Sequence, residues 1–215
     1  KIAIIFRLFC ILITLTLYMD LGMTKIYKFQ DDISTDALNE LEKHSSLAID
    51  TEGSGLQIPH RDKLSLIQFS TGNNDAYIVQ PNRKKYTAPN IVKILENGKI
   101  TKIGHYLRYD VSGLEYFLKC EVKNIFDTKI ASKLCRTYSQ NHGLKDLVLE
   151  FCGKKLDKRL GSSDWNKKLD ELTDAQLQYC SNDVIYLHKI KNELEKMLIR
   201  EKRMEIFKKC LIFLD

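Results

Sequence analysis

The sequence predicts an α/β fold with a mixed five-stranded sheet, in which an antiparallel meander is followed by parallel strands. Helices flank the sheet and make up the C-terminal part. Three strand-patterned segments follow one another too closely for helical crossovers, which indicates antiparallel pairing. Strand and helix patterns then alternate, which is typical of parallel strands joined by helices. From residue 127 onward the apolar residues recur with helical spacing.

The meander is predicted from three segments in order. Residues 46–51 are mostly apolar and end in acid, which is typical of a buried strand, and residues 63–70 alternate between apolar and polar side chains. A Gly-Asn turn sequence at 71–74 separates the second strand from a third at 75–79.

The later elements have their own signals. A proline at its start and a glycine after its end predict a helix over 89–97, and a fourth strand follows at 99–105. Apolar residues on one face predict a helix over 110–120, and a short fifth strand follows at 122–126. Four further helices are expected at 128–138, 144–152, 173–197 and 199–214.

Composition limits the class of protein. The chain has 215 residues, of which 44% are hydrophobic and 29% charged, and this excludes a polytopic membrane protein, a collagen-like chain and a disordered one. The net charge of +6 allows a polyanionic partner without requiring one. The six cysteines have neither disulfide-framework nor zinc-finger spacing, so we expect free thiols and a cytoplasmic location.

The first 22 residues differ from the rest, because Arg7 is the one charged residue between Ile2 and Tyr18. This apolar run is shorter than the ~20 residues that span a bilayer comfortably, and no small-residue cleavage site follows it. Two interpretations stay open: a misassigned start, with the protein beginning near Met23, or an N-terminal anchor. Residues 23–215 are then the functional domain, and no membrane partner is expected unless the extension is real.

Two acids end the first predicted strand. Asp50 and Glu52 are two apart, so both carboxylates point to one side of the strand and Thr51 to the other. Paired carboxylates repel and are costly to desolvate unless a cation neutralises them, which makes the pair a candidate metal site. The same spacing recurs at Glu40 and Glu42, so a solvated strand end is the alternative.

Three other residues extend this pattern. Asp110 opens a helix after the fourth strand, where an acid also interacts favourably with the helix dipole. Tyr179 and Asp183 are four apart and share a face of a late, mostly apolar helix, where both need a polar partner.

Taken in order, these residues resemble the DEDD superfamily of 3′–5′ exonucleases, and ribonuclease D most closely. The resemblance covers about residues 24–200, and position 179, four before the last aspartate, matches the tyrosine subtype. Many relatives have Asn where this chain has Tyr106, and the neighbouring His105 resembles the ribonuclease D branch. Further matching segments are 49–52, 55–56, 66–70, 104–105, 126–128, 142–147 and 162–165.

The resemblance implies a ribonuclease H-like fold and a metal-dependent mechanism. Asp50, Glu52 and Asp183 would hold one ion, Asp50 would bridge to a second, and Asp110 would support the second. Two divalent cations, Mg²⁺ or Mn²⁺, suit such an all-oxygen set, and no small-molecule cofactor is expected. Tyr179 would orient the attacking water, because its ordinary pKa near 10 makes it a poor base at neutral pH.

Substrate contacts are expected at three residues, each with an alternative. Leu56 resembles an apolar wedge against the terminal bases, or it anchors its loop. Trp165 lies in a polar loop, where it could stack on a base or pack beneath the loop. His105 is expected to touch a phosphate of the substrate, with bracing of the Asp110 turn as the alternative.

The expected activity is 3′–5′ exoribonuclease action on the single-stranded 3′ end of RNA, releasing nucleoside 5′-monophosphates, with tRNA 3′ processing as a candidate role. The alternatives are a DNA 3′ exonuclease in repair and a catalytically silent nucleic-acid-binding module. Basic runs at 83–85, 154–159 and 189–209 are individually typical of solvated surface. Together they could supply sequence-independent binding to a polyanion.

Overall fold

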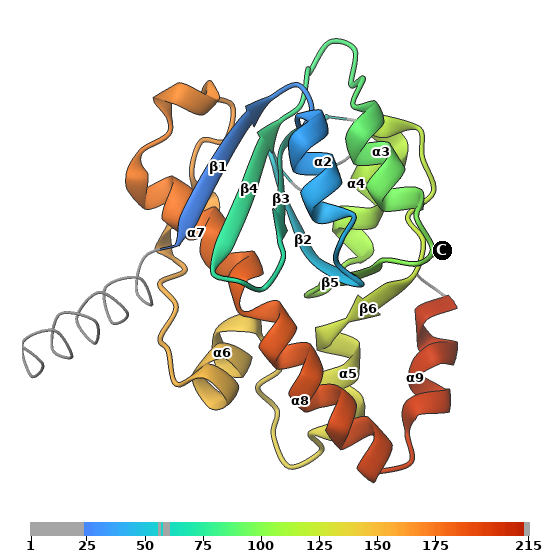
Figure 1. The fold of residues 1–215 in the computed structure, drawn as a ribbon. Coiled ribbons are helices and arrows are strands. Elements are labelled where there is room, and N and C mark those ends of the chain that lie inside the picture. Colours follow the sequence, from blue (N-terminus) through green and yellow to red (C-terminus); the bar gives the residue numbers. More distant parts are fainter. Residues whose placement is uncertain (1–23, 56, 58–60, 213–215) are drawn as a thin grey trace, which may run out of the picture.

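The computed structural model describes residues 24–55, 57 and 61–212. Within them the strands form one sheet in the order β1-β4-β3-β2-β5-β6, with helices on both faces (Figure 1). The predicted α/β class with a mixed sheet and a helical C-terminal part is confirmed.

The meander and the parallel strands form as predicted. Strands β2 (Ser46–Gly53), β3 (Leu64–Ser70) and β4 (Asp75–Gln80) pair antiparallel in sequence order. Strand β5 (Thr101–Gly104) pairs parallel with β2, and β6 (Ile125–Asp127) pairs parallel with β5.

The sheet of the described residues has six strands rather than the expected five. The additional strand β1 (Lys25–Gln30) pairs parallel with β4 at the sheet edge, and a short helix α2 (Thr35–Leu41) follows it. Four of the six β1 residues are exposed, because an edge strand with one half-covered face buries few side chains. Its sequence therefore lacks the apolar alternation that identified the other strands.

Two layers of helices enclose the sheet. Helices α2, α3 (Pro89–Glu96) and α4 (Arg108–Leu118) cover one face, where the largest apolar core lies. The other face carries the remaining helical elements, which are α5 (Thr128–Cys135), α6 (Leu144–Cys152), η1 (Arg159–Ser162), η2 (Leu169–Glu171), α7 (Asp174–Ile185), α8 (Leu187–Arg200) and α9 (Met204–Leu211).

The helix expected over 173–197 is two helices, α7 and α8, which meet at Tyr186. The expected helix over 199–214 is also wrong in its start, since α8 continues to Arg200 and α9 begins at Met204. Lys202 adopts a positive φ of 56°, a left-handed conformation that ends a helix. No helix among the described residues is long and apolar enough to cross a bilayer. The apolar extension 1–22 lies outside the described residues.

Candidate active site

Three of the predicted acids converge at the carboxyl end of β2. Asp50 and Glu52 project from β2 toward α7, which contributes Asp183, and carboxylate oxygens of the three lie within 4.8 Å of one another. They line a cavity of about 380 Å³. The shared direction of Asp50 and Glu52 is the one that strand geometry predicts.

Asp110 reaches the same cavity from the other helix layer. It lies in the first turn of α4 and is 6% exposed, and the Thr51 hydroxyl donates a 2.5 Å hydrogen bond to its Oδ1. Thr51 points away from its two acidic neighbours, as expected, and so meets α4. The four predicted acids therefore line one cavity, with Asp110 bound to Thr51.

A fifth acid, Asp127, positions the turn that precedes Asp110. Its fully buried carboxylate accepts hydrogen bonds from the backbone N–H of Leu107 at 2.7 Å and of Tyr106 at 3.3 Å. The same carboxylate also caps α5 through the N–H groups of Lys129 and Ile130. Asp127 therefore orients the start of α4 without facing the cavity.

Burial and mutual repulsion make these carboxylates reluctant to ionise. Burial raises the pKa of Glu52 to about 8, and the charge of Asp183 adds to the effect. Burial raises the pKa of Asp110 to about 7, although the Thr51 hydrogen bond opposes the shift. The pKa of Asp50 is raised well above its ordinary value by burial and then by Asp110 and Asp183. Such a cluster is stabilised when a cation supplies the missing positive charge.

The ammonium of Lys158 supplies part of that positive charge. Its ammonium forms an ion pair with Asp183 and lies 4.9 Å from the centre of the Tyr179 ring. Burial raises the pKa of Asp183, and the pairing with Lys158 opposes this rise without cancelling it. Among the described residues that line the cavity, one ammonium faces four carboxyl groups, so acidic groups remain in excess. Lys158 was missed at the sequence level because nothing in the basic run 154–159 distinguishes it from its neighbours.

Tyr179 lies on the helix face expected for it, one turn before Asp183. Burial, followed by the nearby acids, raises the pKa of the Tyr179 hydroxyl, so this group keeps its proton and can donate a hydrogen bond. Its ring packs against Trp165, with centroids 5.9 Å apart. The hydroxyl also lies close to Gly161, where an added Cβ would be 2.9 Å away. These contacts fix the direction of the hydroxyl.

His105 lines the cavity with a defined hydrogen-bond pattern. Its Nδ1 lies 3.0 Å from the Thr128 hydroxyl, which donates its single proton to the Gly104 carbonyl at 2.9 Å. The hydroxyl can therefore only accept from His105, so Nδ1 carries the ring proton and Nε2 is an acceptor. Burial lowers the pKa of His105 to about 3, so the ring is neutral.

Two expected substrate contacts have different outcomes. Trp165 is only 2% exposed and packs in an apolar cluster with Leu66 and Ile78, so it presents no face to a base. This burial does not fit the expected base stacking, and the ring packs beneath the loop. Leu56 lies outside the described residues. The exposed aromatic that lines the cavity is Tyr106, at 56% exposure.

The donor set fits a hard divalent cation. Asp50, Glu52 and Asp183 offer only carboxylate oxygens, which are the ligands that Mg²⁺ and Mn²⁺ prefer. No cysteine or histidine belongs to this group of potential ligands within the described chain.

Comparison with known proteins agrees with this geometry. The family described as 3′–5′ exonuclease matches residues 27–199. DNA polymerase I of Aquifex aeolicus is 32% identical over 164 residues, which are 75% of this chain and 26% of the polymerase. Ribonuclease D of Shewanella sp. is 30% identical over 177 residues, which are 81% of this chain and 44% of the ribonuclease. The chain therefore spans less than half the length of either relative.

A solved structure is similar over nearly its whole length. Brucella melitensis NrnC is 38% identical to this chain, with a TM-score of 0.82, and the match covers 88% of this chain and 89% of NrnC. Other structures of NrnC contain bound Mg²⁺ or pGG.

Proposed function

Because this chain belongs to the 3′–5′ exonuclease family, a metal-dependent family of enzymes, we propose that it is an exoribonuclease acting on single-stranded RNA 3′ ends. Its fold is the ribonuclease H-like fold of DEDD exonucleases. The observation that carries the proposal is the convergence of Asp50, Glu52 and Asp183, with Asp110 in the same cavity.

Each acid has a proposed role. Asp50, Glu52 and Asp183 would hold the first cation, and Asp50 and Asp110 a second, with Mg²⁺ or Mn²⁺ as the ion. Divalent cations bound there would activate water and offset charge on the phosphoryl oxygens. The product would be a nucleoside 5′-monophosphate, released one at a time.

A labelled RNA tests this proposal directly. With Mg²⁺, a 5′-labelled RNA should give a ladder of products shortened from the 3′ end, and a 3′-labelled RNA should release labelled mononucleotide at once. EDTA should stop both reactions. Internal products from the first time point would contradict exonuclease action. Retained RNA binding without any cleavage would favour the silent binding module, against which the complete acid set argues.

Tyr179 makes the proposed site one of the tyrosine subtype, with the hydroxyl as a hydrogen-bond donor to the attacking water. Tyr179→Phe keeps the ring that packs on Trp165 and removes only the donor. Turnover should fall about tenfold, which corresponds to the ~1.4 kcal/mol expected of one hydrogen bond. Mg²⁺ titrations monitored by thermal unfolding should give unchanged metal affinity. A lost metal affinity would contradict the orienting role.

His105 supports the preference for RNA. A neutral ring with an acceptor at Nε2 cannot donate to a phosphate oxygen, but it can accept from a sugar hydroxyl. The 2′-hydroxyl, which RNA has and DNA lacks, is such a donor. We assign His105 the recognition of this hydroxyl at the terminal ribose.

His105→Ala should therefore reduce the discrimination between RNA and DNA. Loss of one neutral hydrogen bond costs about 0.5–1.5 kcal/mol, so the ratio of kcat/KM for RNA to that for matched DNA should fall about 3- to 10-fold. Oligonucleotides that differ only in the 2′ group of the last residue give the measurement. An equal loss on both substrates would leave His105 as a brace for the Asp110 turn.

The natural substrate is either a longer RNA or a very short one, and the similar proteins favour different answers. The similarity to ribonuclease D favours processing of longer RNA, such as tRNA 3′ ends. NrnC and this chain cover 90% of each other in the pGG-bound structure, which favours very short RNA. Relative kcat/KM on pGG and on RNAs of increasing length decides between them.

A further inference from the structure

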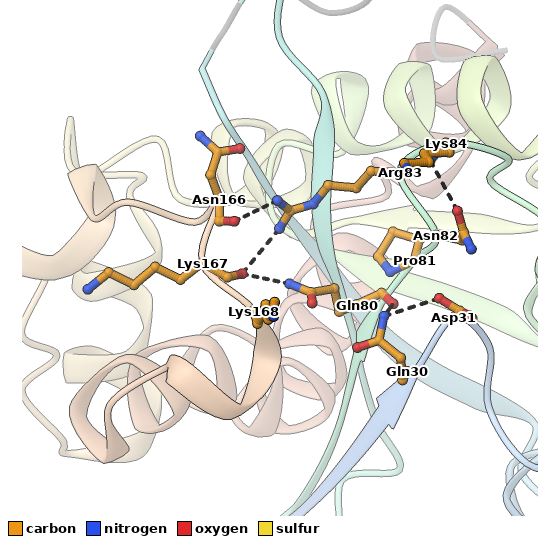
Figure 2. A pocket seen from close by; sticks show the side chains of 10 residues that line it. All are labelled: Gln30, Asp31, Gln80, Pro81, Asn82, Arg83, Lys84, Asn166, Lys167 and Lys168. Atoms are coloured by element: carbon orange, nitrogen blue, oxygen red, sulfur yellow. Dashed lines mark hydrogen bonds between the residues drawn. The ribbon is translucent and has the colours of Figure 1, made fainter.

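A second pocket lies at the ends of β4 and β1, outside the acid cavity (Figure 2). It has a volume of about 380 Å³, and Arg83, Lys84, Lys167 and Lys168 line it together with a single acid, Asp31. None of the four cations pairs with a carboxylate among the described residues. Cations gathered without counter-ions repel one another, so this pocket favours an anion.

Arg83 builds the wall of this pocket. Its guanidinium donates a 2.8 Å hydrogen bond to the backbone carbonyl of Trp165. A second 2.8 Å bond runs to the carbonyl of Asn166, and the amide of Gln80 donates to the carbonyl of Lys167 at 2.8 Å (Figure 2). These bonds fasten the loop that follows Trp165 to the end of β4. The guanidinium of Arg83 is therefore occupied by the loop carbonyls. Within the described residues, the ammonium groups of Lys84, Lys167 and Lys168 remain available in the pocket to bind a ligand.

The register of the sheet places this pocket in line with the acids. Glu52 lies opposite Leu66 in β3, and the pairing of Ile67 with Val79 puts Gln80 opposite Leu66 on the other side. Glu52 and Gln80 are therefore in one row across the sheet, two strand spacings or about 10 Å apart.

Both residues also point to the same face. Leu66 and Ile78, which share the side-chain direction of Glu52 and Gln80, belong to one apolar cluster with Trp165. The pocket and the acid cavity thus lie along the same edge and face of the sheet. A stacked single strand advances about 3.4 Å per nucleotide, so about three nucleotides span the separation.

We propose that this basic pocket binds a backbone phosphate of the RNA about three nucleotides upstream of the bond that is cleaved. The inference rests on the proposed function, because it assumes that the 3′ end of RNA occupies the acid cavity. Lys84, next to Arg83 in the sequence, and Lys168, which follows the segment that Arg83 fastens, supply the positive charge. The contact is independent of base sequence and raises affinity only for strands long enough to reach the pocket.

The test is the double charge reversal K84E/K168E, with K25E/K99E as its matched control. All four lysines are exposed and free of carboxylate partners within the described residues. Lys25 is the first residue of β1 and Lys99 lies two residues before β5, so both are at the amino ends of parallel strands, at the opposite edge of the sheet. Binding is measured in EDTA by fluorescence anisotropy, with a 5′-labelled eight-nucleotide RNA and with labelled pGG. Circular dichroism confirms that both variants fold.

K84E/K168E should weaken binding of the eight-nucleotide RNA at least tenfold and leave the affinity for pGG within about twofold. Its slope of log K against log salt should be less steep by about 0.7 for each phosphate that the variant no longer neutralises. K25E/K99E should bind the longer RNA like the wild type. Three results would each overturn the proposed phosphate site. They are an equal loss of RNA affinity in both variants, an unchanged RNA affinity in K84E/K168E, and a wild-type affinity that does not increase with RNA length. Normal length-dependent binding without hydrolysis in Mg²⁺ would instead refute the proposed function alone.

Discussion

Asp50→Asn should lower kcat at least about 1,000-fold while the protein stays folded. Asp50 is grouped with Glu52 and Asp183 and is also influenced by the charge of Asp110, and the proposed function assigns its carboxylate to both cations. A thousandfold loss corresponds to about 4 kcal/mol of transition-state stabilisation, a size expected for a ligand of the catalytic ion. Single-turnover cleavage of a 5′-labelled RNA in Mg²⁺ measures this loss of rate. A variant that trims within tenfold of the wild type would refute the site.

The same substitution should stabilise the metal-free protein. It removes an acid whose ionisation within the buried acidic cluster is costly, and each kcal/mol gained raises the Tm of a domain this size by about 2–4 °C. Asp183→Asn is the matched comparison, because it removes a charge of the same cluster but leaves the Lys158 ammonium without its partner. Asp50→Asn should therefore raise Tm in EDTA more than Asp183→Asn does.

The acids were predictable because their chemistry is visible in local spacing. Asp50 and Glu52 share a strand face and Tyr179 and Asp183 share a helix face, and these periodicities hold whatever the tertiary structure is. Their convergence with Asp110 required the family pattern, since no local rule brings a helix from the opposite layer to the same cavity. The antiparallel order of the meander was predictable for a similar reason, because short connections leave neighbouring strands few other ways to pair.

The parts that sequence did not indicate depend on tertiary contacts. Lys158 is one of several lysines in a loop, and only the packing of that loop against α7 brings its ammonium to Asp183. Trp165 lies between polar neighbours in the sequence, yet Arg83, distant in the chain, holds its carbonyl and helps seat the ring beneath the loop. Strand β1 escaped detection because most of its side chains are exposed.

The stability of the metal-free protein should fall as the pH rises from about 4.5 to 8. The pKa of Glu52 is about 8 in the folded protein, against an ordinary value of 4.5, so the folded state binds more protons than the unfolded state in this interval. Because the pKa of Glu52 is raised on folding, its contribution to the free energy of unfolding is complete below pH 4.5 and is lost as the pH rises past 8. Asp110, with a pKa of about 7, acts in the same direction. Urea unfolding in EDTA across this range measures the trend.

Mg²⁺ should reverse this dependence, because a cation binds only the ionised carboxylates and stabilises the folded state that holds them. The increase in Tm on adding Mg²⁺ should therefore be small at pH 6 and several degrees larger at pH 8. Lys158→Met is the sharpest variant, since the ammonium lowers the pKa of Glu52 and competes for the same carboxylates. It should be less stable than the wild type in EDTA at pH 8 and gain more from Mg²⁺. A Mg²⁺ effect of equal size at both pH values would mean that these carboxylates are not the ligands.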